Sequence, residues 1–411
     1  MHFYYLLIFI IAATTLFSYL NYKLTRWPAP MAVMIFSLVS AVLLLLLHNL
    51  FPELTADVTD TMSEINLQDL VLKIVLGFLL FAATFRTDVM HFRREARPIL
   101  ALALLSTLAS TFITGGLVYF LAPLLGLRLS LINCLLFGTV IAPTDPIAVL
   151  GLLRKAGIPK SLELQIKGES MINDGIAIVL FTTFLETGNA SQGGSVLGHA
   201  VLLFLQEAAG GALFGALIGY LGLQALKTLN NYKLEILVTL VIVMGGYTLA
   251  DLIHVSGPLT MVAAGLICSR GKTLALSAES MRHVSSFWEL TDSFLNVVVF
   301  LLIGFELLVI PLNLLIAVMG LACILIVLVS RFLAVLLPFY LLRSRFERHS
   351  PLMLTWGALR GGVSIALALS LPAAMHRHEL LPVTYLIAVF SIIVQGMTIG
   401  KLSNKLGLQR G

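Results

Sequence analysis

The run FGTVIAPTDPIAVLGLL holds a carboxylate in the middle of an apolar segment. Asp145 follows Thr144, and Pro143 and Pro146 stand on either side of this pair. Two prolines three residues apart remove two amide donors and clash with preceding carbonyl groups, so a helix must break there. A helix broken inside a membrane presents partial charges that suit ion binding. The prolines alone favour a simple kink, whereas the carboxylate between them favours an ion site.

A second run, KGESMINDGIAIVLF, carries two polar stripes. At 3.6 residues per turn, Ser170 and Asp174 lie on one helix face, and Glu169 and Asn173 lie on the adjoining face. An alternative interpretation places Glu169 in the first turn of a helix at the membrane rim, where an acid favours the helix dipole. That alternative does not explain Asp174, because apolar sequence continues from Ile176 to Leu185. An ionisable residue at such depth is by default a functional candidate.

A third run, LTWGALRGGVSIALALSLP, places Arg360 directly before Gly361 and Gly362. Arginine stays charged in proteins, so a buried guanidinium needs a carboxylate. We predict Glu169 as its partner, and snorkelling of Arg360 to the membrane rim is the alternative. The two glycines permit an unwound or closely packed backbone. Arg331 also lies within an apolar run, and the sequence names no partner for it.

The composition is that of an all-membrane protein. Of the 411 residues, 59% are hydrophobic and 11% are charged, and the mean hydropathy is +0.99. Soluble domains carry roughly 25% charged residues, so a soluble enzyme is excluded. The net charge of +5 fits basic loops on one membrane face better than nucleic-acid binding. At about 20 residues per span, apolar runs predict thirteen helices, at 3–20, 30–47, 69–86, 98–121, 130–153, 162–187, 198–224, 234–252, 257–269, 286–309, 313–342, 351–373 and 381–402.

The charge of the loops predicts the orientation. Loops after the odd-numbered spans carry twenty lysines and arginines, whereas loops after the even-numbered spans carry only Arg128 and Arg377. Basic loops face the cytoplasm, so we predict a multi-pass cell-membrane protein with the C-terminus cytoplasmic and the N-terminus outside. Spans 1–6 and 8–13 form two six-helix sets. Because the single span 7 lies between them, the second set has the opposite orientation in the membrane to the first. The TDP and RGG runs fall in the fifth span of each set, as broken helices do in transporters with inverted repeats.

The motifs APTDPIAV, GESMINDGIAIV and WGALRGGVSIALAL, in this order, resemble those of the monovalent cation:proton antiporters. The match is to the sodium/proton exchanger branch with its NhaP-type bacterial members, and it covers nearly the whole chain. The resemblance implies an all-α, NhaA-like antiporter fold with broken crossing helices, and a homodimer. It also implies a division into dimerisation helices at 1–97, core ion-transport helices at 98–190, linker and dimerisation helices at 191–311, and core helices with a short cytoplasmic tail at 312–411.

The resemblance further implies a site for a monovalent cation. Its ligands would come from the two polar runs: Asp174, Asp145, Ser170, Thr144 and Asn173. Asp174 would bind either the cation or a proton, and Glu169 with Arg360 would form a structural ion pair. Some family members carry an acid in the third span, where this chain has Ala82 and Ala83 in the run FLLFAATF.

Exchange follows from competition at one carboxylate. A carboxylate buried away from water favours neutralisation, by a proton or by a cation, so the two exclude each other. With one exchanging carboxylate we predict electroneutral 1:1 antiport of sodium, or of lithium or potassium, against protons. The expected partners are sodium, protons and membrane lipid, with no cofactor and no nucleic acid. The alternatives are an intramembrane aspartyl-type hydrolase, because Asp145 and Asp174 lie in neighbouring spans, and a potassium-selective exchanger or channel on the same fold.

Overall fold

A computed structural model describes residues 2–47, 66–189, 196–311, 313–343, 346–347 and 349–407. Within these ranges the ordered elements are helices, which confirms the all-α prediction. The acids Glu53, Asp57, Asp60 and Glu64, between the predicted spans 30–47 and 69–86, lie outside the described residues.

The first half of the chain forms helices of very different length. They are α1 (His2–Leu24), α2 (Ala29–Leu47), α4 (Leu67–Asp69), η1 (Leu70–Val75), α5 (Leu76–Phe85), α6 (Val89–Arg94), α7 (Ala96–Ala101), η2 (Leu102–Ser106), α8 (Thr107–Leu121), η3 (Ala122–Leu125), α9 (Leu131–Ile141), α10 (Ile147–Lys155) and α11 (Lys160–Asn189). Several of these join end to end, so that α4, η1 and α5 make one helical rod, and α7 to η3 make another.

The second half begins with long helices and has a broken helix, α17 and α18, before its last helical rod. Its elements are α12 (Val196–Lys227), α13 (Tyr232–Leu252), α14 (Gly257–Ala275), α15 (Ala278–Phe305), η4 (Glu306–Leu308), α16 (Leu314–Leu341), α17 (Ser350–Trp356), α18 (Gly362–Leu369), η6 (Ala373–Met375), α19 (Arg377–Phe390), η7 (Ser391–Gln395) and α20 (Gly396–Lys405).

Among the described residues, nine helical rods are long and apolar enough to cross a membrane: Leu6–Leu24, Ala29–Leu47, Leu67–Phe85, Ala96–Leu125, Gly198–Lys227, Tyr232–Leu252, Ala278–Leu308, Leu314–Leu341 and Arg377–Lys405. The predicted total of thirteen spans therefore stays a prediction. Helix α14 covers the ninth predicted span, 257–269, and continues six residues beyond it to Ala275. It does so through Arg270 and Lys272, which end the apolar run but not the helix.

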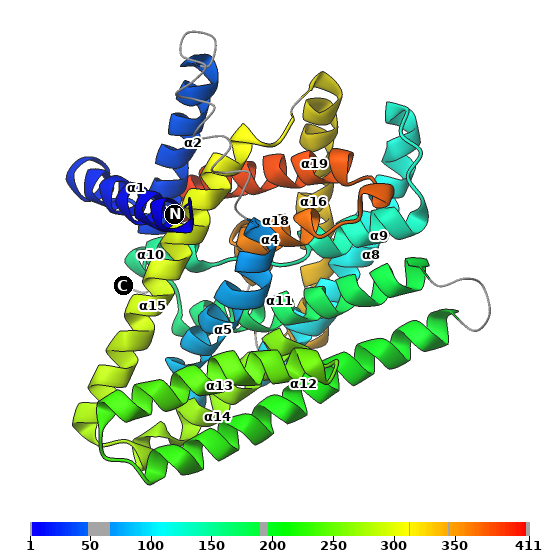
Figure 1. Cartoon of the computed structure of the whole chain (residues 1–411). Coiled ribbons are helices and arrows are strands. Elements are labelled where there is room, and N and C mark those ends of the chain that lie inside the picture. The colour runs from blue at the N-terminus through cyan, green and yellow to red at the C-terminus, as the bar shows by residue number, and fades with distance from the viewer. Residues whose placement is uncertain are drawn as a thin grey trace.

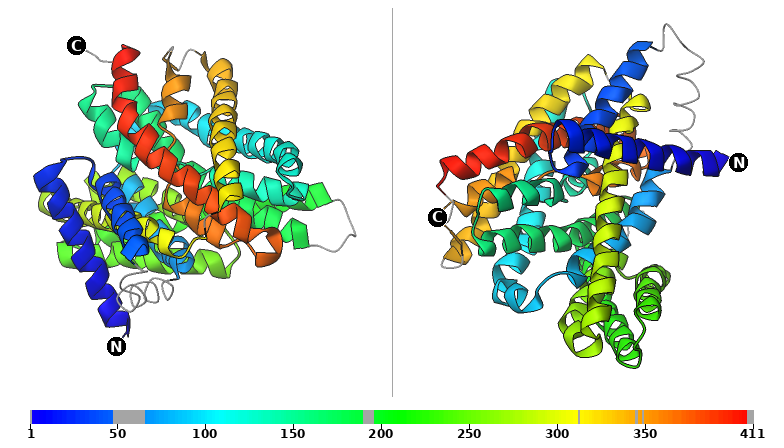
Figure 2. Two further views of the ribbon diagram at one scale, coloured as in Figure 1. Left: turned by 90° about the horizontal axis from the view of Figure 1, so that it is seen from above. Right: turned by 90° about the vertical axis from the view of Figure 1, so that its left-hand side faces the viewer.

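The helices gather into two packed groups around α11 (Figure 1). Helices α12, α13 and α14 pack on one another, and α14 also packs on α5. On the other side of α11, helix α9 packs against α8 and α18, and α16 packs against α8 and α19. Helices α1 and α2 lie beside α15 at the edge of the molecule (Figure 2).

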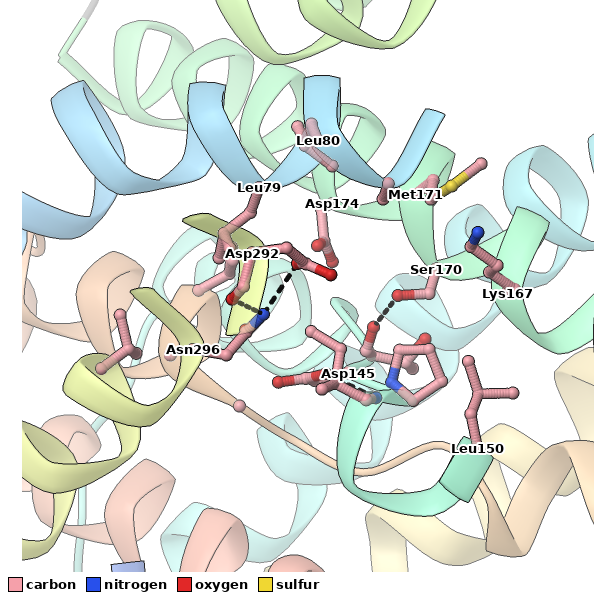
Figure 3. Close-up of a pocket in the computed structure, with 18 of the residues that line it drawn as sticks. Leu79, Leu80, Asp145, Leu150, Lys167, Ser170, Met171, Asp174, Asp292 and Asn296 are labelled. Atoms are coloured by element: carbon pink, nitrogen blue, oxygen red, sulfur yellow. Dashed lines mark hydrogen bonds between the residues drawn. The ribbon is translucent and has the colours of Figure 1, made fainter. Parts of the chain in front are cut away.

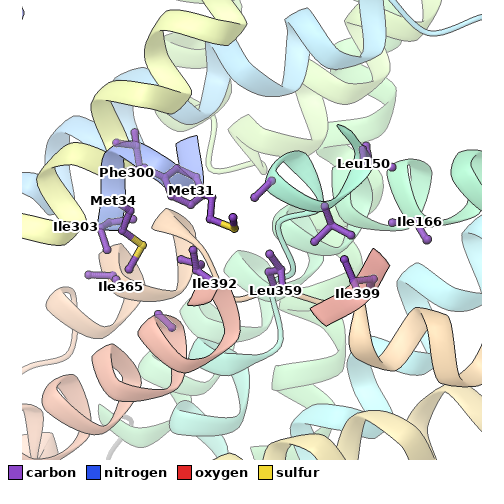
Figure 4. Close-up of a cluster of buried hydrophobic side chains, with 14 of the residues drawn as sticks. Met31, Met34, Leu150, Ile166, Phe300, Ile303, Leu359, Ile365, Ile392 and Ile399 are labelled. Atoms are coloured by element: carbon purple, nitrogen blue, oxygen red, sulfur yellow. The ribbon is translucent and has the colours of Figure 1, made fainter. Parts of the chain in front are cut away.

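The largest apolar cluster packs segments that are distant in sequence. It joins Met31 and Met34 of α2 to Phe300 of α15, Ile365 of α18 and Ile392 of η7 (Figure 4). Each of these five side chains is at most 1% exposed. Because buried side chains of this size stabilise a fold by about 1.5–3 kcal/mol each, this cluster fixes α18 and η7 against α15 and so holds the broken helix in place.

Candidate functional site

The two breaks meet in the centre of the molecule. Helix α9 ends at Ile141 and α10 begins at Ile147, while α17 ends at Trp356 and α18 begins at Gly362. The segments between them touch, because Asp145 N donates to Leu359 O at 2.7 Å. The breaks predicted around Pro143, Pro146, Gly361 and Gly362 therefore lie side by side.

Gly361 lets the second segment approach the first. A Cβ atom at this position would lie 2.7 Å from both Cβ and Oδ2 of Asp145. Real Cβ atoms essentially never come this close to another heavy atom. Glycine is therefore required here for close backbone approach rather than for an unusual backbone angle.

Charged side chains complement the half-helix ends at the crossing. Arg360 Nη1 donates to the carbonyl oxygens of Ala142 at 3.1 Å and Pro143 at 3.0 Å, at the C-terminal end of α9. Asp145 Oδ1 accepts from Ile147 N at 2.9 Å, at the N-terminal end of α10. A cation at a helix C-terminus and an anion at a helix N-terminus are both favourable. These contacts fix the orientation of Arg360 and Asp145.

Helix α11 packs its polar stripes against the first break. Ser170 Oγ donates to Thr144 O at 2.5 Å, and Asn173 Nδ2 donates to Thr144 Oγ1 at 2.8 Å. Asp174 lies one turn beyond Ser170, and its Oδ1 atom is buried without a hydrogen-bond partner among the described residues. A buried polar atom left unsatisfied is costly, so this oxygen is suited to a proton or a cation.

These residues line a cavity of about 420 Å³. Figure 3 shows Asp174 and Ser170 on one wall and Asp145 on another. Thr144 is also a lining residue, whereas Asn173 reaches the site only through its hydrogen bond to Thr144. The structure thus brings four of the five predicted ligands to one cavity and leaves the fifth directly behind it.

Helix α15 adds two polar lining residues that the sequence analysis did not identify, Asp292 and Asn296. Asp292 Oδ2 lies 3.1 Å from Arg86 Nη1, and Arg86 also lines the cavity. A signal was present, because Asp292 falls within the predicted span 286–309 and an ionisable residue in a span is a functional candidate. In the third predicted span, where some family members carry an acid, the structure has alanines at the site: Ala82 is buried and Ala83 lines the cavity.

The predicted ion pair between Glu169 and Arg360 is wrong, because Glu169 pairs with Arg331 instead. Glu169 Oε1 lies 2.6 Å from Nη2 of Arg331, and both side chains are at most 3% exposed. Arg331 Nη1 also donates to Ser106 Oγ at 2.8 Å. The physical reason is the unwound segment before α18, which turns the Arg360 guanidinium toward the carbonyl groups at the end of α9 and leaves Glu169 to Arg331 of α16.

Comparisons with known proteins agree with this geometry. The family model described as "Sodium/hydrogen exchanger, transmembrane" matches residues 7–405. The chain is 42% identical over 405 residues to the Na(+)/H(+) antiporter NhaP of Pseudomonas aeruginosa, covering 96% of this chain and 95% of that one. It is 34% identical over 359 residues to the Na(+)/H(+) antiporter NhaH of Halobacillus dabanensis, covering 85% of each.

Solved structures show the same fold. The sodium proton antiporter MjNhaP1 from Methanocaldococcus jannaschii at pH 8 superposes with a TM-score of 0.76 at 18% identity, over 100% of both chains. The family and this structural neighbour are transporters and not enzymes, which weighs against an intramembrane hydrolase. By its whole-length match and its identity to these relatives, the chain belongs to the sodium/hydrogen exchanger family.

Proposed function

We propose that this protein exchanges sodium for protons across a membrane, with Asp174 as the carboxylate that the two ions share. The observation that carries this proposal is the buried Oδ1 of Asp174, which has no hydrogen-bond partner among the described residues, in a cavity that Asp145 also lines. Relatives named Na(+)/H(+) antiporters support sodium as the cation. The oxygen atoms of Ser170 and Thr144 are hard ligands that suit such an ion.

The chemistry follows from neutralisation of one carboxylate. Asp145 is already engaged by the backbone N–H of Ile147, and Arg360 is engaged by the end of α9. Asp174 is then the group whose charge must be balanced by something that enters the cavity. A proton and a sodium ion each satisfy it and exclude the other. If the protein changes its open side only when the Asp174 carboxylate is neutralised by one of these ions, exchange is 1:1 and electroneutral.

The cavity also suggests which face is open. Arg86 and Arg154 line it, and their side chains are 30% and 60% exposed. Arg86 follows the end of α5 and Arg154 lies in the last turn of α10, and the charge bias assigns both ends to the cytoplasm. We assign this conformation to the state open toward the cytoplasm, in a plasma-membrane protein with its N-terminus outside.

Alternating access requires one part of the protein to move against another. We propose that core helices in 98–190 and 312–411 carry the site, and that helices in 1–97 and 191–311 form the static, dimerising part. The lining of the cavity supports this division, because the broken segment 143–146 and helices α10, α11 and α18 line it from one side, and η1, α5 and α15 line it from the other.

The test is cation-induced collapse of a pH gradient in everted vesicles, with sodium, lithium and potassium added in turn. Sodium should collapse the gradient for the wild type and not for Asp174→Asn. Asp69→Asn is the matched control, because Asp69 pairs with Lys73 at an exposed position outside the cavity. Equal activity of Asp174→Asn and the wild type would refute the assignment, and collapse by potassium alone would identify the potassium-selective alternative.

A membrane potential separates coupled exchange from a channel. Vesicles loaded with potassium and treated with valinomycin carry a potential without a pH gradient. Electroneutral exchange predicts no proton movement on adding the ionophore alone. Proton or sodium flux driven by the potential would contradict the 1:1 stoichiometry and favour uncoupled conductance.

A further inference from the structure

Asp292 is the third carboxylate that lines the cavity, beside Asp145 and Asp174, among the residues that the structure describes. It comes from α15, on the side of the cavity opposite the two broken helices (Figure 3). Asn296 holds it in place, because its Nδ2 donates to Asp292 O at 2.7 Å and to Asp292 Oδ1 at 2.9 Å. The Asp292 carboxylate is therefore oriented by its own helix before any ion arrives.

A tethered cation already occupies this carboxylate. The Arg86 guanidinium lies 3.1 Å from Asp292 Oδ2 and 3.3 Å from Glu289 Oε1. Arg86 follows α5, the helix whose Ala83 also lines the cavity. The Asp292 side chain is 22% exposed and that of Arg86 is 30% exposed. Ion pairs that water reaches are weak, so an incoming cation can displace this guanidinium.

Other cations surround the same opening. Lys167 lies on α11, seven residues before Asp174, and its Nζ lies 3.0 Å from Thr87 Oγ1. Arg86, Arg154 and Lys167 all line the cavity that leads to Asp174. Three positive side chains make the electrostatic potential in this opening more positive, which opposes the entry of a monovalent cation. The Asp292 carboxylate lies among them and is therefore a favourable binding position for such a cation.

We propose that Asp292 is an entry site for the monovalent cation on its way to Asp174, and that Arg86 sets the apparent affinity by competing for that carboxylate. Asn296 is a positioning residue, since it acts through Asp292. This inference rests on the proposed sodium/proton exchange. It adds a second, outer carboxylate whose role is to deliver the cation, not to carry the proton.

The experiment is the sodium concentration that gives half-maximal collapse of a pH gradient in everted vesicles. Arg86→Gln frees Asp292 and should lower this concentration about two- to fivefold, the range expected for removing one partly exposed competing ion pair. Asp292→Asn should raise it by a similar factor while the maximal rate stays within about twofold. An unchanged or raised half-saturating concentration in Arg86→Gln overturns the proposal.

A double-variant cycle isolates the competition from a general change in potential. If Arg86 acts mainly through Asp292, most of the effect of Arg86→Gln on the half-saturating sodium concentration is lost in the Asp292→Asn background. If the full fall persists in that background, Arg86 acts on the whole cavity and the proposal is overturned. Glu279→Gln is the charge-matched control, because it removes one acid from the same helix at an exposed position 13 residues away.

Failure of the inference is distinguishable from failure of the proposed function. No sodium response in the wild type refutes the exchange itself, whereas a wild-type response with unchanged Asp292 variants refutes only the entry site. Complete loss of transport in a monodisperse Asp292→Asn protein also overturns it, because that is the behaviour of the central carboxylate. Should Asp292→Asn not be extracted as a monodisperse protein, Asn296→Ala replaces it, with an expected rise in half-saturating sodium of about two- to threefold.

Discussion

The buried pair between Glu169 and Arg331 makes a sharp prediction about stability. Its atoms are 2.6 Å apart and its side chains are at most 3% exposed, so water cannot replace either partner. Removing one member of such a pair leaves an uncompensated buried charge and costs about 3–5 kcal/mol. We expect Arg331→Met to lower the free energy of unfolding by this amount. Glu169→Gln in the same protein should restore most of it, because the isolated charge is then gone.

The same reasoning fixes the size of the coupling. The interaction energy in the Glu169 and Arg331 cycle should be about 2–4 kcal/mol. A second cycle combines Glu169→Gln with Arg360→Met. It should give under about 1 kcal/mol, because Arg360 donates to the Ala142 and Pro143 carbonyls. Loss of the Ser106 hydrogen bond contributes only about 1 kcal/mol to the Arg331 variant, and Ser106→Ala measures that share.

The assay is denaturation of the purified protein by sodium dodecyl sulfate in mixed micelles, followed by tryptophan fluorescence. The chain has three tryptophans, and Trp288 is fully buried, so its emission reports loss of packing. A larger coupling of Glu169 to Arg360 than to Arg331 would refute the reasoning. It would restore the pairing that the sequence alone suggests.

The remaining predictions concern close packing and the site. Gly361→Ala should lose most sodium-dependent transport, because the added Cβ would lie 2.7 Å from Asp145. Gly400→Ala is the control and should transport as the wild type does in the same vesicles, because a Cβ there would meet no atom of the described residues within 4 Å. Gly304→Ala should lower the free energy of unfolding by about 1–3 kcal/mol, because its Cβ would lie 1.8 Å from Ser37 Oγ and 2.7 Å from Ser37 Cβ. Equal denaturation midpoints of Gly304→Ala and the wild type would contradict the packing of α15 on α2.

Local sequence determined the helices and where two of them break. Apolar runs set the helical segments, since a membrane leaves no other way to satisfy the backbone. Proline removes amide donors wherever it stands, so the interruption around Pro143 and Pro146 needed no tertiary information. Helical spacing likewise placed Ser170 and Asp174 on one face. The all-helical class and the family follow from these local features.

Pairing across helices was not local. Two buried arginines, Arg331 and Arg360, were possible partners for Glu169. Their distance from Glu169 in the sequence does not predict which one pairs with it, because they come from different helices. The choice depends on the unwound segment before α18, which directs Arg360 to the end of α9. A backbone without regular structure has no periodicity from which to read the direction of a side chain.

The tertiary structure also decided which residues share the cavity with Asp174. Sequence placed Asp145 and Asp174 in neighbouring spans, and their common motif region made a joint site predictable. Asp292 lies more than a hundred residues further along the chain and reaches the cavity only because α15 packs against α5 and α18. Periodicity fixes the face on which a side chain lies within its helix. The packing of one helix on another decides what that face meets, and this depends on the whole set of contacts rather than on any single run of residues.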